Sequence, residues 1–368
     1  MADPTSCRIN GLDRLEPKRI LCCQLRQIGD VLLLTPSIHM LKKRWPNAQI
    51  DVFTEKKCAP VLENNPEVNH VWALDRKMGI LESLRYYRKV GTGGGLGRYD
   101  LVIDFQQLPR IRWVMLFSDA PVKLSYPPPW YNQLVYTHWA KVSGPYAAKS
   151  KAGVLMHAFN LPWENDPPRI YLTDEEKRAA AGQLAEWGLK PGQTLVTVDA
   201  THRRVFRLWP AKHYARLLTL AAKKRPDLRF LLLYGPGELD VVRDVAAQAG
   251  LDGLDGGDGR VIVPGEMLSL REMAAVQERA ALHLGNCSSP RHFALAVGTP
   301  TLTLRGSTSS SWTFPGPGQE DMSLGLPCQP CSEDACALDL KCLRGLTPDM
   351  VLPRVLKMLG NQPGGSPA

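Results

Sequence analysis

Short apolar runs alternate with segments of helical spacing along most of this chain, and this alternation limits the folds that the chain can adopt. The runs have the length and composition of buried strands, whereas the longer segments repeat apolar residues at helical intervals. The predicted strands are residues 20–25, 50–53, 68–74, 101–104, 195–198, 230–234, 261–263 and 282–284, and the predicted helices include residues 174–187, 211–224 and 270–281. Because strands that alternate with helices form parallel sheets covered on both faces, we predict an α/β fold.

The length of 368 residues is enough for two domains, each with its own hydrophobic core. A Pro-rich stretch at residues 162–168, Pro-Trp-Glu-Asn-Asp-Pro-Pro, is a suitable linker between them. We therefore predict an N-terminal domain over residues 17–165, a C-terminal domain over residues 166–345, and a terminal helix with a disordered tail over residues 346–368.

The composition, with 44% apolar and 22% charged residues, is that of a soluble globular protein. No apolar run approaches the roughly 18 residues that a membrane span needs. Residues 1–16 lack the apolar core of a signal peptide, so we expect a cytoplasmic protein. The net charge of +9 favours anionic partners, which include nucleic acid, phosphates and acidic membrane surfaces, although solvated surface charge would give the same total.

The strand predicted at residues 20–25 leads to Gly29-Asp30, where a helical pattern of apolar residues begins and continues to Trp45. This places the Asp30 carboxylate at the edge of the sheet where α/β proteins bind their ligands. Asp30 could act there as a general base, and the helix N-terminus favours its ionised form. The alternative is that Asp30 only caps the helix.

A second pattern of this kind lies in the C-terminal half. The strand at residues 282–284 leads into Ser288-Ser289-Pro290, and a helical pattern follows. Ser is a preferred N-cap residue and Pro a preferred first helical residue, so we predict that a helix starts here. The free N–H groups at such a helix start can bind a diphosphate, although an ordinary capped helix would have the same sequence.

The first of these patterns, Arg26-Gln-Ile-Gly-Asp-Val-Leu-Leu-Leu-Thr-Pro36, closely resembles the N-terminal signature of glycosyltransferase family nine, the lipopolysaccharide heptosyltransferases. The resemblance continues through residues 45–52. The segment 287–300 resembles the second signature of the family, D-[ST]-G-x-x-H followed by A-A-x-G-x-P. Ser288, His292, Gly298 and Pro300 match this signature, whereas Cys287 and Ser289 replace the family Asp and Gly.

This resemblance covers most of the chain and implies a GT-B fold, in which two Rossmann-like doubly wound domains face each other across a cleft. It also implies an inverting glycosyltransferase that moves a sugar, heptose in the family, from an ADP-sugar donor to a lipopolysaccharide core acceptor. In that reaction Asp30 would be the catalytic base that takes the proton of the acceptor hydroxyl. Basic groups and helix amides would offset the charge on the leaving diphosphate, so no cofactor would be required.

The resemblance extends to a set of donor-binding residues in the second half of the chain. Arg207 stands where relatives place a phosphate-binding Lys, and Glu238 stands where they place a ribose-binding Glu. Leu268 takes the place of a Met beside the base, although a core position would also explain it. The family Asp at position 287 contacts the donor sugar, so Cys287 leaves the identity of that sugar open. The donor-binding set is Arg207, Glu238, Leu268, Cys287, Ser288, Ser289, His292 and Thr308, with Thr308 as a phosphate contact and His292 orienting the helix start.

The first domain would hold the acceptor, an anionic lipid glycan in keeping with the positive net charge. Arg110 and Arg112, which follow the strand at residues 101–104, are the candidate contacts. Gln106-Gln107-Leu108 departs from the Q-G-L of many relatives, so the acceptor hydroxyl stays open. A protein that acts on such a lipid would work at the cytoplasmic face of the inner membrane, in peripheral contact with its anionic surface.

Four cysteines near the C-terminus, Cys328, Cys331, Cys336 and Cys342, form a cluster in the sequence. Four thiolates at such spacing can hold zinc or an iron–sulfur centre, although their order does not match a common zinc ribbon. Reduced structural thiols, or an occasional disulfide, are the alternative.

Two other functions stay open. Cys287 and Ser289 would suit a GT-B protein that binds nucleotide or glycan without turnover or with altered specificity. The positive charge would suit a nucleic-acid-binding protein, but the chain has no recognisable nucleic-acid motif, and its aromatic and basic residues are not interleaved. We therefore expect a nucleotide sugar and a lipopolysaccharide core as partners, and no nucleic acid.

Overall fold

A computed structural model describes residues 7–142, 144–251, 259–331 and 336–360. The chain divides into two compact units, Met1–Tyr171 and Leu172–Ala368, which are described separately as unit 1 and unit 2. The division falls in a stretch without helix or strand between Phe159 and Asp174, which also contains the predicted linker. Within the described ranges, no helix has both the length and the apolar character needed to cross a bilayer.

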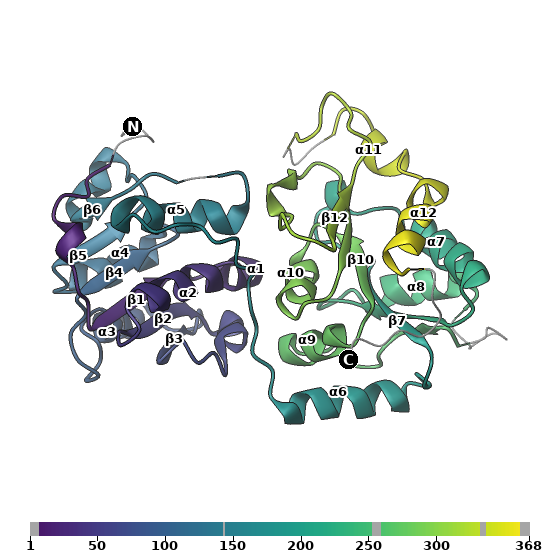
Figure 1. Ribbon diagram of the computed structural model, residues 1–368, viewed down its shortest axis with the longest axis horizontal. Coiled ribbons are helices and arrows are strands. Elements are labelled where there is room, and N and C mark those ends of the chain that lie inside the picture. The colour runs from purple at the N-terminus through teal and green to yellow at the C-terminus, as the bar shows by residue number, and fades with distance from the viewer. Residues whose placement is uncertain (1–6, 143, 252–258, 332–335, 361–368) are drawn as a thin grey trace. The chain divides into compact units, whose positions relative to one another are not determined.

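Unit 1 is a parallel six-stranded sheet with helices on both faces (Figure 1). On its faces α3 packs against α4, and α2 packs against α5. The elements, with η for a 3-10 helix, are η1 (Leu12–Arg14), β1 (Arg19–Cys23), α1 (Ile28–Leu32), α2 (Thr35–Arg44), β2 (Gln49–Glu55), η2 (Lys56–Leu62), β3 (His70–Leu74), α3 (Ile80–Gly91), β4 (Leu101–Asp104), α4 (Pro109–Phe117), β5 (Val122–Ser125), η3 (Trp130–Val135), β6 (His138–Trp139) and α5 (Ala147–Phe159).

Unit 2 is a second parallel six-stranded sheet of the same kind. Helix α9 packs against α6 and α10, and α7 packs against α8 and α12. The elements are α6 (Asp174–Glu186), β7 (Thr194–Asp199), η4 (Val205–Arg207), α7 (Ala211–Lys224), β8 (Leu228–Leu233), α8 (Leu239–Ala249), β9 (Val261–Ile262), α9 (Leu270–Glu278), β10 (Leu282–Asn286), α10 (Ser289–Ala296), β11 (Thr301–Leu304), η5 (Ser310–Trp312), β12 (Gln319–Met322), α11 (Lys341–Arg344) and α12 (Pro348–Met358).

The two sheets have the same strand order. It is β3-β2-β1-β4-β5-β6 in unit 1 and β12-β11-β10-β7-β8-β9 in unit 2. When the strands are numbered within each unit and the second sheet is read from its β9 end, both orders are 3-2-1-4-5-6. This is the order of a doubly wound Rossmann sheet, so the α/β prediction is confirmed. In this arrangement the chain leaves the two central strands in opposite directions, and ligands bind at this switch point beyond the strand ends. The switch points lie between β1 and β4 and between β7 and β10.

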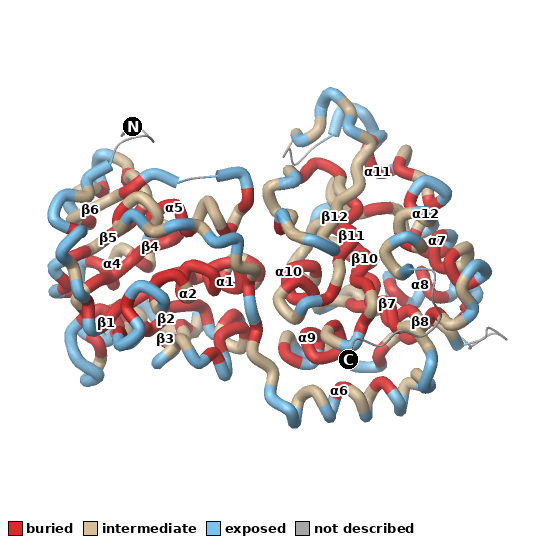
Figure 2. Tube along the Cα trace, viewed as in Figure 1, coloured by how far each residue is buried: buried red, intermediate tan, exposed pale blue. Residues whose placement is uncertain are grey.

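The strands form the buried centre of each unit (Figure 2). All five residues of β1 are buried, and Ile20 on β1 lies in register with Ile50 on β2 and with Leu101 on β4. In unit 2 the core includes Trp209, whose indole N–H donates to the Leu346 carbonyl at 2.8 Å and so ties the segment before α12 to the start of α7. Burial on both faces explains why these strands are near-continuous apolar runs in the sequence.

The helical pattern that starts at residue 29 forms two helices, α1 and α2, where we predict one. Pro36 has no N–H to donate to the Leu32 carbonyl, and the Thr35 hydroxyl donates to that carbonyl instead, at 2.8 Å. The first helix therefore ends, and a second begins with Pro36 in its first turn, where proline is tolerated.

The sequence prediction lacks the strands β5, β6, β11 and β12. Strand β6 has only two residues, and β12 is the polar, half-exposed segment Gln-Glu-Asp-Met at the edge of its sheet. Neither contains an apolar run. The predicted terminal helix corresponds to α12, and the tail at residues 361–368 lies outside the described residues.

Candidate active site

Asp30 lies at the switch point of unit 1, in the first turn of α1 and shortly after β1. Its Oδ2 accepts a hydrogen bond from the backbone N–H of Gln27 at 3.2 Å, and its Oδ1 lies 3.0 Å from Nζ of Lys151 on α5. The carboxylate thus completes a capping box on α1, as the capping alternative predicts, yet its side chain stays 22% exposed. Capping does not exclude catalysis here, because each carboxylate oxygen can accept more than one hydrogen bond and the side chain stays partly exposed.

Hydrogen bonds from the end of β4 hold the loop that leads to Asp30. Gln106 accepts from the backbone N–H groups of Leu25 and Arg26 at 3.1 Å each. Asp104, the buried last residue of β4, in turn accepts from the N–H groups of Gln106 and Gln107 at 2.8 and 2.7 Å. Burial raises the pKa of Asp104 to about 6, although these hydrogen bonds oppose the shift. Residues at the end of β4 therefore hold the backbone that follows β1 and leads to Asp30.

Arg110, one of the two predicted acceptor contacts, belongs to a cluster of basic side chains. Its Nη1 lies 3.8 Å from Oε1 of Glu55, and Lys57 and Arg76 lie 3.2 and 3.7 Å from the same carboxylate. Glu55 is buried, whereas the three basic side chains are about half exposed. The residues come from the ends of β2, β3 and β4, and this cluster contains one acidic and three basic side chains.

Arg112, the other predicted contact, bonds within the unit instead. Its Nη1 donates to Oδ1 of Asn132 at 2.9 Å, which ties α4 to η3. The exposed surfaces of these two elements carry large apolar side chains, namely Trp113, Leu116, Trp130, Tyr131 and Leu134. Because η3 follows the end of β5 and is tied to the first turn of α4, Trp130, Tyr131 and Leu134 lie toward the same edge of the sheet as Asp30, whereas Leu116 lies in the last turn of α4.

Asp199 ends β7 at the switch point of unit 2 and is absent from the predicted set. Its neighbour in register on β10 is Gly285, where a Cβ atom would lie 2.7 Å from the Cβ of Asp199, so only glycine leaves room. Asp199 is 3% exposed and accepts a hydrogen bond from the Ser288 hydroxyl. Burial raises the pKa of Asp199 to about 7, against the effect of that hydrogen bond. The sequence signal is an Asp directly after an apolar run.

Glu238, the predicted ribose contact, is the N-cap residue of α8. Its Oε2 accepts from the Thr201 hydroxyl at 2.6 Å and from the Gly235 N–H at 2.8 Å. The Thr201 hydroxyl is also 3.4 Å from Oδ1 of Asp199. Two predicted residues, Glu238 and Ser288, are therefore brought together through Thr201 and Asp199, which the sequence prediction missed.

Arg207 and Cys287 lie near this group. Burial lowers the pKa of His202, as does the charge of Arg207, and Nε2 of His202 is 3.3 Å from the Cys287 carbonyl oxygen. The Cys287 sulfur is 3.5 Å from Nη1 of Arg291. The loops after β7 and β10, which carry Arg207 and Cys287, thus meet at the switch point.

The other predicted donor residues occupy neighbouring strand ends. Burial lowers the pKa of His292 well below its usual range, so the ring is neutral, in keeping with an orienting role. The Thr308 hydroxyl, in the turn after β11, is buried and has no hydrogen-bond partner among the described residues. Ser289 is the first residue of α10. Leu268 is half-buried in the loop between β9 and α9, so it is not a core residue.

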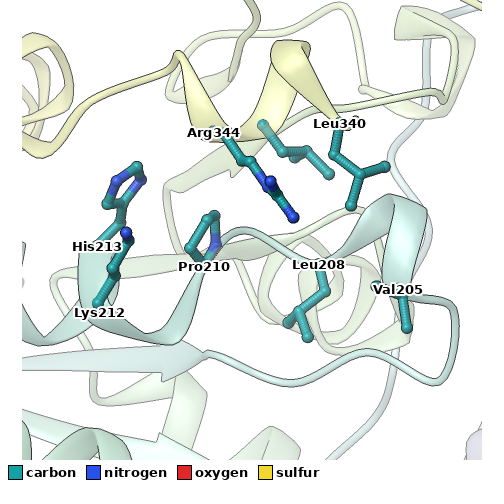
Figure 3. A pocket seen from close by; sticks show the side chains of 8 residues that line it. Val205, Leu208, Pro210, Lys212, His213, Leu340 and Arg344 are labelled. Atoms are coloured by element: carbon teal, nitrogen blue, oxygen red, sulfur yellow. The ribbon is translucent and has the colours of Figure 1, made fainter. Parts of the chain in front are cut away.

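A cavity of about 520 Å³ lies beside this group, between the loop after β7 and α11 (Figure 3). Lys212, Arg344 and His213 line it together with apolar side chains that include Leu208 and Leu340. None of its lining residues belongs to the predicted donor-binding set. The cavity is therefore separate from the group around Asp199.

The four clustered cysteines all have free thiols. In the part of the chain that the structure describes, no group of three or more His, Cys, Asp or Glu side chains is placed to hold a metal ion. Metal binding stays a prediction that elemental analysis of the purified protein can test.

Comparisons with known proteins identify the family of this chain. The model of glycosyltransferase family 9 (heptosyltransferase) matches residues 93–341, about two thirds of the chain. This range contains the whole predicted donor-binding set, whereas Asp30 lies before it. Lipopolysaccharide heptosyltransferase 3 of Escherichia coli K12 is 26% identical over 298 residues, which cover 77% of this chain and 81% of that protein.

Solved structures share the fold over nearly the whole chain. A glycosyltransferase family 9 protein of Veillonella parvula is 21% identical, with a TM-score of 0.79 over 95% of this chain and 98% of its own. ADP-heptose lipopolysaccharide heptosyltransferase II of E. coli is 18% identical, with a TM-score of 0.74 over 93% and 98% of the two chains. These likenesses concern the fold, while the family model covers most of the sequence. This chain therefore belongs to glycosyltransferase family 9, the heptosyltransferases, and is a glycosyltransferase.

Proposed function

We propose that this enzyme transfers heptose from an ADP-sugar donor to a lipopolysaccharide core acceptor by a single displacement with inversion. The names of the relatives support both substrates, since one is a lipopolysaccharide heptosyltransferase and another an ADP-heptose lipopolysaccharide heptosyltransferase. The observation that carries the proposal is the partly exposed Asp30 carboxylate, which Gln27 and Lys151 hold at the switch point of unit 1.

In the proposed step Asp30 acts as general base. A carboxylate oxygen takes the proton of the acceptor hydroxyl while the hydroxyl oxygen forms a bond to the anomeric carbon of the donor. The bond between that carbon and the diphosphate breaks, and the nucleoside diphosphate leaves with the electron pair. Because Gln27 and Lys151 already fix the carboxylate, little reorientation is needed when the acceptor arrives.

Unit 2 carries groups that suit a nucleoside diphosphate. We propose that Arg207 and the first amides of α10 offset charge on the leaving diphosphate without a metal cofactor. The Thr308 hydroxyl, which has no partner in the described part of the chain, would donate to a phosphate oxygen. Oε2 of Glu238 is engaged by Thr201 and Gly235, which leaves Oε1 to accept a ribose hydroxyl.

The donor sugar is the part of the proposal that Cys287 affects most. A thiol cannot accept sugar hydroxyls as a carboxylate does. We expect Cys287→Asp to shift the donor preference toward heptose, measured by mass spectrometry on a panel of nucleotide sugars. An unchanged preference would contradict a role of this position in sugar recognition.

On the acceptor side, we propose that Lys57, Arg76 and Arg110 bind an anionic group of the lipopolysaccharide core. Glu55 holds the three side chains near one another, and its single charge leaves an excess of two positive charges to attract a phosphate or carboxylate. Arg112 is the weaker candidate, because it already donates to Asn132.

We propose that the enzyme makes peripheral contact with the cytoplasmic face of a membrane through the exposed apolar side chains of η3. Trp130, Tyr131 and Leu134 are largely exposed, and aromatic residues favour the interfacial region of a bilayer. The basic cluster at the same sheet edge would be attracted to anionic headgroups. An enzyme anchored in this way would meet a lipid-linked acceptor at the surface where that acceptor resides.

The test is product formation from ADP-heptose and a core acceptor that lacks the heptose, detected by mass spectrometry. We expect Asp30→Asn to reduce turnover by roughly 1,000-fold or more, within the range that general-base removal and loss of orientation give together, while ADP still binds. Asp119→Asn is the matched control, because Asp119 is exposed and precedes β5 at the opposite edge of the sheet.

The same experiment separates the alternative functions. If the wild-type protein binds ADP but forms no product with any sugar of the panel, a binding protein without turnover becomes the better explanation. If Asp30→Asn retains full activity, the proposed base is wrong even though transfer occurs. Salt-sensitive DNA binding tighter than glycan binding would instead favour the nucleic-acid alternative.

A further inference from the structure

The Ser288 hydroxyl does not cap the helix that Ser288 precedes. Ser288 is the N-cap residue of α10, but it makes no side-chain hydrogen bond to the first turn. Its hydroxyl donates to Oδ2 of Asp199 on the neighbouring strand β7 instead. A hydroxyl at an N-cap position ordinarily accepts a hydrogen bond from a first-turn N–H. Because the Ser288 hydroxyl donates to Asp199 instead, it leaves the first-turn N–H groups of α10 without a side-chain acceptor.

Two other helices of unit 2 show the ordinary arrangement. The Thr173 hydroxyl accepts from the Glu176 N–H at 3.2 Å at the start of α6, and the Ser269 hydroxyl accepts from the Glu272 N–H at 3.3 Å at the start of α9. Both form complete capping boxes. Thr347, the N-cap residue of α12, makes no such hydrogen bond either, so Ser288 differs from these residues in that its hydroxyl donates to a buried carboxylate.

The buried Arg291 side chain at the start of α10 has no acidic partner. The Arg291 side chain, on the first turn, is 3% exposed, and it donates to Cys287 Sγ, the Trp312 carbonyl and the Thr313 hydroxyl, which are all neutral. No ion pair in the described part of the chain includes it. A buried guanidinium without a carboxylate favours an anion from outside.

The neighbouring turn after β11 adds two hydroxyl groups. Those of Ser307 and Thr308 are buried and have no hydrogen-bond partner among the described residues. Buried hydroxyls ordinarily find partners, and these two stand at the sheet edge where β10 and β11 end side by side. They are a second sign, independent of the helix start, that a polar ligand belongs here.

We propose that Asp199 is a positioning residue of the donor site, which withholds the Ser288 hydroxyl from α10 so that the first amides of the helix stay open to a phosphate of the donor. This inference rests on the proposed nucleotide-sugar donor. Without Asp199 the hydroxyl turns to the first turn of α10 and competes with the phosphate for the same N–H groups. The close approach of β7 and β10 at Gly285 brings Asp199 within reach of Ser288.

The test is a double-mutant cycle read out by calorimetric binding of ADP to the purified full-length protein. We expect Asp199→Ala to weaken ADP binding about tenfold, which is what a serine cap is worth when it competes with the ligand. In the Ser288→Ala background the same change should have an effect below about twofold, because no hydroxyl is left to compete. Asp199→Asn should restore most of the binding, since its amide oxygen still accepts from Ser288.

Loss of fold is checked by the melting temperature of each variant. If Asp199→Ala does not fold, Asp199→Val, which fills more of the volume and suits a strand, takes its place in the cycle. Thr173→Ala removes a true cap in the same unit, so it should lower the melting temperature and leave ADP binding unchanged.

The outcomes separate this inference from the proposed function. Equal weakening by Asp199→Ala with and without the Ser288 hydroxyl would overturn the positioning role, as would unchanged binding in Asp199→Ala. Absence of ADP, UDP and GDP binding in the wild-type protein would overturn the nucleotide donor itself, and the inference with it.

Discussion

Asp199→Asn should stabilise the protein at alkaline pH and much less at acidic pH. The charged groups that face Asp199 are few: Glu238 at the start of α8 adds negative charge, and the Tyr214 phenol on α7 stays neutral because burial raises its pKa. Burial without a cation raises the pKa of Asp199 from its ordinary value of 3.8 to about 7. The folded state therefore binds a proton more strongly than the unfolded state, so stability is full at low pH and is lost as pH rises from 3.8 to 7.

The size of the effect follows from the shift. One pKa unit corresponds to about 1.36 kcal/mol, so the ionised Asp199 lowers the free energy of unfolding by about 4 kcal/mol above pH 7 and by about 1.6 kcal/mol at pH 5. The Asp199→Asn side chain keeps the shape and the acceptor for Ser288 but not the charge. The stability difference between variant and wild type should thus grow by about 2.7 kcal/mol between pH 5 and pH 8, or roughly 5–11 °C in melting temperature.

Scanning calorimetry of both proteins at the two pH values measures this difference directly. Comparison at each pH cancels the titration of all other groups. Asp240→Asn is the matched control, because Asp240 lies fully exposed on α8 and should give no pH-dependent difference. A stability gain that is equal at pH 5 and pH 8, or a loss at both, would refute the argument that burial raises the pKa of Asp199.

Three further changes probe other parts of the molecule. Gly285→Ala would place a Cβ 2.7 Å from that of Asp199 and should cost about 1–3 kcal/mol, measured by thermal melting; a neutral result would contradict the close packing. Glu176→Gln should cost about 1–3 kcal/mol at neutral pH, because its hydrogen bonds to buried Arg271 lower the pKa of Glu176 from 4.5 to about 2. That stability exists above pH 4.5 and fades as pH falls to 2, so denaturant curves of the two proteins should converge there. Leu134→Asp, at a fully exposed site, should leave stability unchanged and reduce sedimentation with anionic vesicles about tenfold or more; unchanged sedimentation would exclude η3 from the membrane contact.

The sequence predicts the parts of this fold whose signals are local. Strand β4 and helix α7 have the predicted bounds, because a strand buried on both faces and a helix with one apolar face have distinct periodicities. Strand β12 escapes prediction because it is polar and half exposed at a sheet edge, where pairing with β11 rather than burial makes it a strand.

The site residues also differ in whether their signals are local in the sequence. Asp30 and Ser288 can be found from the sequence, since each stands shortly after a strand and at the start of a helix. Asp199 also follows an apolar run, but its role cannot be predicted from that signal, because it depends on pairing with Gly285 and on the Ser288 hydroxyl, which lie far along the chain. The cluster around Glu55 likewise exists only after three strand ends have been brought to one edge.

The shared strand order also has a consequence for synthesis on the ribosome. In each unit the strand made first occupies a central position: β1 lies between β2 and β4, and β7 lies between β8 and β10. A nascent chain therefore exposes β1 on one side until Leu101 has emerged, and β7 until Leu282 has emerged. Pairing over such sequence distances is slow, and unpaired apolar strands bind to one another or to chaperones in the meantime. Each half of this enzyme is thus a late folder, completed only when most of its own length has left the exit tunnel.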